Sequence, residues 1–355
     1  MHNHPEMLDR VILHIGTHKT GTTAVQGSLG EASDALLSRG VLYPRSGRRG
    51  VGHVELARLA EHPGEMPGGR EGEQELLEEI RAASPGTLVL SAERFTSRVS
   101  PRRTRWAEWL CTHLDARRVQ VIGYVRPQWE YIESAYAQRT KAGVTWVDFE
   151  RHLHSALADS KYDYPTVFGA WRRTFGDALE IRPYAPELLV GSDAVEDFWH
   201  AAGLGSPPSS LDRHRNPRTG AKATEMLRVL RSLLADYRLD GLVPVTQVMR
   251  RAQRRIEAEF PDDEPFRALT PELVARIAES FRASNATFVR DYLGGQHTSL
   301  FEPPADFPSA VATWSLERAS SEELEFLGEL VVEALSALGS SSRPLRDGAV
   351  ARHPG

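Results

Sequence analysis

The sequence has a single cysteine, Cys111, and no apolar run long enough to cross a bilayer. One cysteine excludes an intramolecular disulfide, so we expect a fold that does not depend on oxidation. A membrane-spanning helix needs ~20 apolar residues in succession. The first residues, Met1 to Glu6, also lack the basic and then apolar pattern of a secretory leader. These absences favour a soluble cytoplasmic protein that does not bind membranes.

The sequence also lacks an excess of positive charge. Its 43 Lys and Arg residues against 48 Asp and Glu residues give a formal net charge of -5. General nucleic-acid and anionic-membrane binders usually carry a basic excess, so the composition argues against both classes. Two local basic runs, Pro101 to Arg105 and Arg250 to Arg255, are expected to form solvated faces.

Short apolar runs alternate with helical patterns over the first part of the chain. Four of these runs are expected to be strands, at Val11–Ile15, Thr87–Ala92, Val119–Val125 and Leu179–Tyr184. Helical sequence separates them, with helices expected over Thr23–Arg39 and Glu73–Ala83 among others. The strands should therefore pair in parallel with right-handed crossovers. The pattern predicts an α/β fold with a central parallel sheet, whose ligands bind beyond the carboxyl ends of the strands.

The pattern changes after about residue 205, where the remaining sequence is helical. We expect an α/β domain over 8–205, a helical region over 206–338 and a frayed tail from Gly339 to Gly355. The helix predicted from Pro271 carries a wide apolar stripe. We therefore expect the helical region to pack on the sheet domain or on a partner, including a second copy in a homodimer.

The segment after the first strand carries the clearest functional pattern. Val11–Ile15 leads directly into Gly16-Thr17-His18-Lys19-Thr20-Gly21-Thr22-Thr23 and then into an amphipathic helix. Glycines at such a turn let backbone N–H groups point at an anion beside a helix N-terminus. Nucleotide triphosphatases place Lys and Ser/Thr directly after the second glycine. Here Thr22 and Thr23 hold those positions, and Lys19 lies inside the loop.

A magnesium ligand is also missing from the second predicted strand. Triphosphatases use an acidic residue at the end of a neighbouring strand to hold the metal. The strand Thr87–Ala92 contains no aspartate, and the first acid after it is Glu93. We therefore expect a donor that is used without a metal ion.

Two motifs, in order, resemble those of sulfotransferases that use 3′-phosphoadenosine 5′-phosphosulfate (PAPS). The run Leu13–Thr23 is similar to the family's 5′-phosphosulfate loop. The strand Val121–Val125, followed by Arg126 and, eight positions later, by Ser134, is similar to its 3′-phosphate motif. A guanidinium fork can grip a phosphate dianion, and a hydroxyl two helical turns on can close the same pocket.

The resemblance implies a P-loop-type three-layer fold over roughly the first 190 residues. It also implies that PAPS, and its product PAP, bind without a metal. The binding residues carried over from the two motifs are Gly16, Thr17, His18, Lys19, Thr20, Gly21, Thr22, Thr23, Arg126 and Ser134. Lys19 is the expected partner of the bridging oxygen, where charge grows as the bond to sulfur breaks. His18 could contact the sulfate or pack against the sheet edge.

The general base has two candidates, because relatives of this type use a glutamate or a histidine. Glu93 directly follows a predicted strand at the ligand end of the sheet, although Arg94 offers it a structural salt bridge. His53 follows a Gly- and Arg-rich loop, and its ordinary pKa near 6.5 suits proton abstraction at neutral pH. Its alternative is a structural role at the start of a helix.

The acceptor is expected to be a hydroxyl or amine of a carbohydrate or another small metabolite. The residues that could line its groove are Tyr136, Gln138, Lys141, Lys161, Tyr162 and Tyr164, of which Tyr162 and Tyr164 could equally belong to the core. The loop lacks the tryptophan that follows the second glycine in animal cytosolic relatives, so adenine stacking is left to another residue. Two alternatives stay open: an ATP-dependent kinase of small molecules, and a nucleotide-binding scaffold without catalytic activity.

Overall fold

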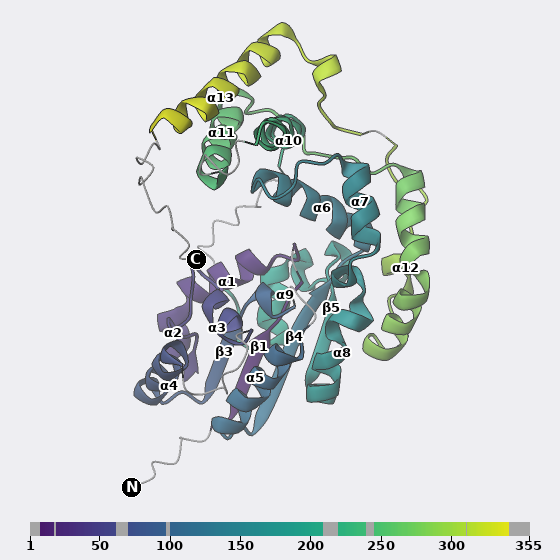
Figure 1. The fold of residues 1–355 in the computed structure, drawn as a ribbon. Helices are drawn as coiled ribbons and strands as arrows, with labels where there is room; N and C mark the ends of the chain where they lie inside the picture. Colours follow the sequence, from purple (N-terminus) through teal and green to yellow (C-terminus); the bar gives the residue numbers. More distant parts are fainter. Residues whose placement is uncertain are drawn as a thin grey trace, which may run out of the picture. The chain divides into compact units, whose positions relative to one another are not determined.

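The computed structural model describes residues 8–17, 19–61, 70–96, 100–208, 219–238, 245–309 and 311–340 (Figure 1). Within these ranges, all strands belong to one parallel sheet with the order β2-β3-β1-β4-β5. The strands are β1 (Arg10–His14), β2 (Val41–Leu42), β3 (Thr87–Ser91), β4 (Arg118–Val125) and β5 (Leu179–Pro183). The predicted α/β class with a central parallel sheet is confirmed.

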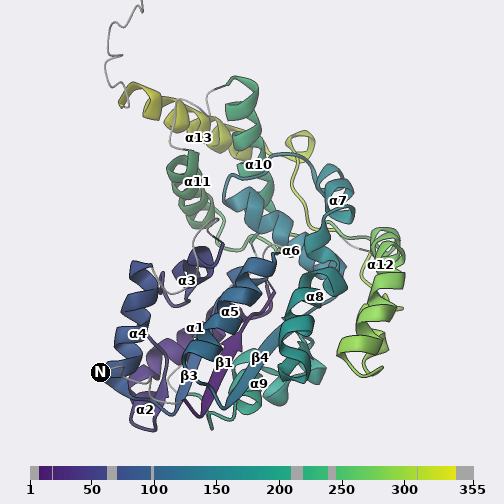
Figure 2. The same ribbon diagram turned by 60° about the horizontal axis from the view of Figure 1, so that its bottom comes forward.

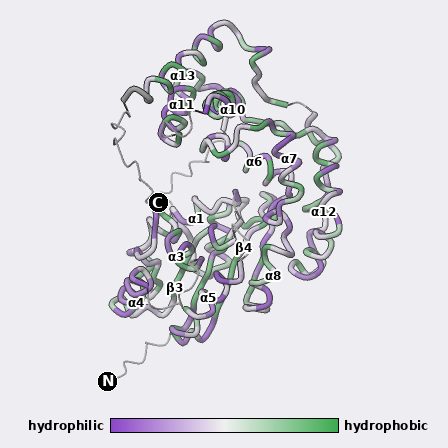
Figure 3. Tube along the Cα trace, viewed as in Figure 1, coloured by the Kyte–Doolittle hydropathy of each residue, from purple (hydrophilic) through white to green (hydrophobic). Residues whose placement is uncertain are grey.

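The central strands β1, β3 and β4 carry apolar residues on both faces because both faces of the sheet are covered. On β1, Val11 and Leu13 join one hydrophobic cluster, whereas Ile12 joins the other. This division follows from the two-residue period of a strand, which points successive side chains to opposite faces. The same alternation continues on β3 and β4, and Figure 3 shows the hydrophobic colour along both strands.

Helices cover the two faces and form a three-layer arrangement (Figures 1 and 2). One face packs against α1 (Thr22–Glu31), α2 (Ser33–Leu37) and α9 (Ala194–Ala201). The other face packs against α3 (Val54–Leu59), α4 (Glu71–Ala83), α5 (Pro101–His113) and α8 (Tyr164–Phe175), and α12 (Pro271–Tyr292) packs on α8. Aromatic rings fill the contact between α8 and α12. The ring centre of Phe288 lies 6.0 Å from that of Phe168 and 5.3 Å from that of Tyr164.

The chain divides into two compact units made of interleaved segments. The first contains Met1–Ile132, His154–Arg215 and Pro271–Phe307, and the second contains Glu133–Leu153, Asn216–Thr270 and Pro308–Gly355. This division differs from the boundary expected near residue 205. The difference arises because the apolar stripe of α12 packs on α8 and so belongs to the sheet unit.

The second unit has its own hydrophobic core between helices. Its helices are α10 (Ala221–Asp236), α11 (Val245–Glu259) and α13 (Ser321–Ser340), with the second part of α6 (Gln128–Lys141) and the first part of α7 (Phe149–Leu157). Leu227 of α10, Met249 of α11 and Leu330 of α13 are buried together in this core. Within the described ranges, no helix of either unit is long and apolar enough to cross a membrane.

The strand order makes the carboxyl ends of β1 and β4 a candidate ligand-binding position. These two strands are neighbours in the sheet, with Leu13 opposite Val121. The chain leaves β1 toward β2 and β3 on one side and leaves β4 toward β5 on the other. Open parallel sheets bind ligands where the direction of winding reverses in this way. The Gly16–Thr22 loop follows β1 and Arg126 follows β4, so both lie at this point.

Candidate functional site

The loop between β1 and α1 contains two residues in the left-handed region. Lys19 has φ 70° and Gly21 has φ 73°. The conformation costs a lysine roughly 1 kcal/mol, so other contacts must hold it. The guanidinium of Arg126 supplies one of them, because its Nη1 donates a hydrogen bond of 2.9 Å to the Lys19 carbonyl oxygen. The two predicted phosphate motifs are thus in direct contact.

Gly21 is required by space as well as by conformation. A Cβ atom at this position would lie 2.7 Å from the Cβ of Ala194 and 3.2 Å from Cε2 of Tyr184. Gly21 also precedes α1, and among the described residues no side chain caps the N-terminus of this helix. The first N–H groups of a helix have no intrahelical acceptors and attract anions.

Two threonines of the loop, Thr17 and Thr20, use their hydroxyl groups to hold the loop in shape. Thr17 Oγ1 donates to the Tyr124 carbonyl oxygen at 2.8 Å, and Thr20 Oγ1 donates to the Thr17 carbonyl oxygen at 2.7 Å. These two bonds brace the loop against β4 and across itself. Thr22 is buried with its Oγ1 3.5 Å from that of Thr20, whereas Thr23 is exposed. Lys19 is half-buried, and His18 lies outside the described residues.

Arg126 is enclosed by groups from three elements. Its side chain is 11% exposed and forms an ion pair with Glu130 one helical turn later. The ring of Tyr184, which directly follows β5, lies 5.7 Å from the guanidinium carbon, within cation–π range. The same ring lies 3.2 Å from the position of a Cβ atom on Gly21, so Tyr184 lies beside both the loop and Arg126. Tyr184 was missed from the sequence as a site residue, although its place after a strand could have identified it.

Ser134 lies on α6 but belongs to the second unit, whereas Arg126 belongs to the first. Its part in a shared phosphate site with Arg126 therefore stays a prediction from the spacing of the motif.

Glu93 begins a short 3-10 turn, Glu93–Phe95, directly after β3. The turn is tied to the loop by Thr96, whose Oγ1 donates to the carbonyl oxygens of Gly16 at 3.0 Å and Glu93 at 3.2 Å. Glu93 is half-buried, and its charge helps to raise the pKa of Tyr131, which is raised mainly by burial. The structure therefore joins the Glu93 turn to the loop through a residue, Thr96, that the sequence pattern did not reveal.

His53, the second candidate base, has a structural environment. Its Nε2 lies 2.9 Å from the Pro44 carbonyl oxygen, and the Ser91 N–H donates to its Nδ1 at 3.1 Å. Both ring nitrogens are therefore engaged by the backbone of a fully buried site. Burial lowers the pKa of His53 to about 4, the largest cause being loss of solvation of the charged ring. In this conformation His53 has no nitrogen with which to accept a substrate proton.

The three tyrosines considered for the acceptor groove are buried core residues. Tyr162 and Tyr164 are fully buried in the first unit, and Tyr136 is fully buried in the second. Tyr136 packs against Phe149 and donates from its hydroxyl to Glu225 at 3.2 Å. Of the two roles left open for Tyr162 and Tyr164, the structure supports the core, and Tyr136, which was expected to line the groove, is a core residue as well.

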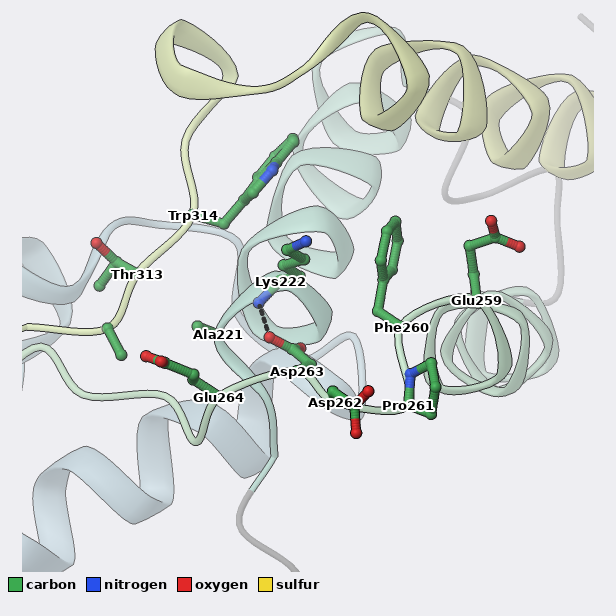
Figure 4. Close-up of a pocket in the computed structure, with 11 residues that line it drawn as sticks. Ala221, Lys222, Glu259, Phe260, Pro261, Asp262, Asp263, Glu264, Thr313 and Trp314 are labelled. Carbon is green, nitrogen blue, oxygen red and sulfur yellow. Dashed lines mark hydrogen bonds between the residues drawn. The ribbon is translucent and has the colours of Figure 1, made fainter.

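A separate pocket of ≈ 480 Å³ lies within the second unit (Figure 4). Its carboxylates come from Glu259, Asp262, Asp263 and Glu264. Asp263 accepts hydrogen bonds from the N–H groups of Lys222 and Ala223 and so caps α10. The acidic lining would repel a nucleotide phosphate, so this pocket does not compete with the loop of the first unit as a donor site.

Comparison with protein-family models, with curated proteins and with solved structures found no match for this chain.

Proposed function

We propose that this chain is a PAPS-dependent sulfotransferase with a P-loop-type donor site. The proposal rests mainly on one observation: two phosphate motifs that lie far apart in the sequence are joined by the hydrogen bond from Arg126 to the Lys19 carbonyl. Both motifs follow neighbouring parallel strands at the position where the winding of the sheet reverses.

The residues present fit the chemistry of this donor. The N-terminus of α1, which no side chain of the described residues caps, and the left-handed backbone of Gly21 before it suit a 5′-phosphate. The guanidinium of Arg126 suits a second phosphate group on the same nucleotide. Binding there would require Arg126 to share or exchange its ion pair with Glu130, which is 41% exposed and can turn toward solvent.

PAPS supplies a sulfuryl group, bonded through oxygen to the 5′-phosphate, that passes to the acceptor oxygen or nitrogen while PAP leaves. In this proposal Lys19 stabilises the charge that grows on the bridging oxygen. Glu93 takes the proton that the acceptor loses as its bond to sulfur forms. Thr96 holds the Glu93 turn against the loop, and this link fixes the base relative to the donor. The acceptor class remains a hydroxyl or amine of a carbohydrate or small metabolite.

Calorimetric titration with PAP, with and without magnesium, tests the donor. We expect binding that does not need magnesium and that weakens about tenfold to a hundredfold in Lys19→Ala and in Arg126→Ala, since each removes charge-assisted hydrogen bonds. Arg118→Ala is the matched control, because Arg118 is an exposed arginine at the opposite end of the same strand. Absence of PAP binding together with magnesium-dependent ATP binding would replace the proposal with the kinase alternative.

Transfer of sulfate from radiolabelled PAPS to a panel of phenols, amines and sugars then tests catalysis. Glu93→Gln is expected to lower kcat by about 10²–10⁴ and to leave PAP affinity unchanged. If PAP binds but no acceptor is sulfated, the scaffold alternative gains support. If Glu93→Gln retains full activity, Glu93 is not the base.

A further inference from the structure

A fully buried histidine, His14, lies at the end of β1 beneath the loop. Its ring packs against Phe198 and Tyr124, with ring centres 4.7 Å and 5.8 Å away. Burial lowers its pKa to about 3, so the ring is neutral at physiological pH. No motif in the sequence assigns this residue a role. A neutral imidazole has one donor nitrogen and one acceptor nitrogen, and the neighbours determine which is which.

The hydrogen-bond partners of Ser91 assign the tautomer of His14. Gln26 Nε2 donates to Ser91 Oγ at 3.2 Å, and Ser91 Oγ lies 2.8 Å from His14 Nδ1. The Ser91 hydroxyl has one proton, and His14 Nδ1 is the acceptor beside it. If Nδ1 carried a proton instead, Ser91 Oγ would receive two donors and its own proton would lack this acceptor. The arrangement that gives the Ser91 hydroxyl both a donor and an acceptor therefore places the ring proton of His14 on Nε2.

The protonated Nε2 of His14 is directed at the loop. It lies 3.1 Å from the position that a Cβ atom on Gly16 would occupy, and Thr22 Oγ1 lies 3.1 Å from the same position. Among the described residues, Nε2 has no hydrogen-bond partner although it is buried. A buried donor without an acceptor costs free energy, so such a group commonly marks a functional constraint.

We propose that His14 is a positioning residue that orients the Thr22 hydroxyl toward the donor phosphate. In this arrangement, which rests on the proposed function, Gln26 donates to Ser91 Oγ and Ser91 donates to His14 Nδ1, whereas the bond from His14 Nε2 to Thr22 Oγ1 forms when the phosphate binds. When the Thr22 hydroxyl donates a hydrogen bond to the bound 5′-phosphate, a lone pair of its Oγ1 can accept a hydrogen bond from the Nε2–H of His14. Each bond in such a chain polarises the next one toward the anion.

A double-mutant cycle between His14 and Thr22 tests the chain, with PAP affinity measured by calorimetry. His14→Leu is expected to raise the Kd for PAP about tenfold, the equivalent of one hydrogen bond. Thr22→Val removes the hydroxyl at nearly constant shape and is expected to raise the Kd for PAP by at least the same factor. In the double variant, loss of His14 should add little, because the group it orients is already absent. Additive effects, or an unchanged Kd in His14→Leu, would overturn the proposal.

Two further variants separate positioning from packing. His14→Gln places an amide N–H near the former Nε2 and should recover most of the affinity that His14→Leu loses. Ser91→Ala should weaken PAP binding severalfold without changing any residue of the loop. His113→Gln, a histidine of α5 on the opposite face of the sheet unit, is the control and should bind PAP normally.

Nitrogen-detected NMR of the histidine rings tests the chain in the unaltered protein, even if the core variants fold poorly. The expected signal of His14 is that of a neutral ring protonated on Nε2, with a downfield shift of this proton when PAP binds. A ring protonated on Nδ1 would overturn the proposal while leaving the sulfotransferase assignment intact. If the unaltered protein does not bind PAP, both proposals fall together.

Discussion

At the scale of single residues, the geometry of the loop depends on positions where only one residue type fits. Gly21 combines a left-handed backbone with a close approach to Ala194 and Tyr184. The need for glycine there was predictable, since a phosphate loop requires this freedom at a helix start. The contacts that enforce it were not, because Ala194 and Tyr184 come from sequence that carries no recognisable motif.

Gly21→Ala is expected to lower the free energy of unfolding by about 2–4 kcal/mol, because left-handed strain adds to a steric overlap with Ala194. It should also abolish PAP binding. Gly27→Ala in the same helix is the control: a Cβ there meets nothing within 4 Å and should stabilise the helix by about 0.5–1 kcal/mol. Chemical denaturation measures both. Equal stability of the two variants would contradict this account of Gly21.

The buried histidines predict a dependence of stability on pH. His53 is neutral in the fold with a pKa lowered to about 4, against an ordinary value of 6.5. Below that ordinary value the unfolded chain binds a proton that the folded chain excludes, so stability falls as the pH decreases. The expected contribution of His53 is a loss of about 2 kcal/mol between pH 7 and pH 5.

Urea denaturation at several pH values measures this slope. His53→Gln should be less stable at pH 7, because it loses the bonds to Pro44 and Ser91, and should have a flatter slope. His113→Gln should retain the full slope. An unchanged slope in His53→Gln would show that folding does not lower the pKa of His53, and would return it to consideration as a base.

At the scale of elements, the period of apolar residues in the sequence located the helices and strands well. It could not identify the buried polar side chains that join one element to another. The helix predicted over Glu73–Ala83 is observed as α4 (Glu71–Ala83). Its Glu73 is fully buried and accepts a hydrogen bond of 2.9 Å from Trp106 Nε1 of α5, while its other oxygen accepts from the Arg70 N–H. A pattern based on apolar positions assigns a glutamate to the exposed face of a helix, so it could not predict that Glu73 is buried.

Glu73→Ala is expected to lower the free energy of unfolding by about 2–4 kcal/mol, since it removes a helix cap and leaves the buried Trp106 N–H without this acceptor. Glu73→Gln keeps an acceptor and should lose less. Glu75→Ala is the control, because Glu75 is an exposed residue of the same helix and should change stability by no more than about 0.5 kcal/mol. Thermal unfolding measures the stability of the three variants. Equal stability would contradict the stabilising role of the hydrogen bonds of Glu73.

Helix ends were less predictable than helix positions. The single helix expected over Thr23–Arg39 is divided into α1 and α2, and Ala32 lies between them. Gly27 and Gly30 weaken the helical preference of this segment, and the N–H of Ala32 already bonds to carbonyls of α1 in a terminating pattern. A periodicity of apolar residues continues across such a break and therefore does not report it.

At the scale of the whole molecule, the interleaving of the two units could not be derived from the sequence. The apolar stripe of α12 indicated that this helix would be buried, but not against which surface. Its Phe288 is fully buried among Tyr164, Phe168 and Phe301 of the first unit. The contacts of Phe288 with Tyr164 and Phe168 join residues more than a hundred positions apart, and no local pattern encodes such contacts.

Phe288→Ala tests the assignment of α12 to the sheet unit. It is expected to lower the free energy of unfolding by about 3–5 kcal/mol through the cavity that it leaves. Val332→Ala on α13 is the control, because that side chain is 62% exposed. Hydrogen exchange should show increased opening in α8 of the Phe288 variant. Loss of protection confined to the second unit would contradict the packing described for α12.

The hydrogen bond between Arg126 and Lys19 cannot form until well after the loop has been synthesised. The ribosome releases the loop early, but the Tyr124 carbonyl and the Arg126 guanidinium that brace it come 107 residues after Thr17 and Lys19. Tyr184 emerges later still, and α12 after that. A nascent chain therefore carries the loop sequence long before the loop can take its shape. The proposed nucleotide binding should thus begin only when most of the chain has been synthesised.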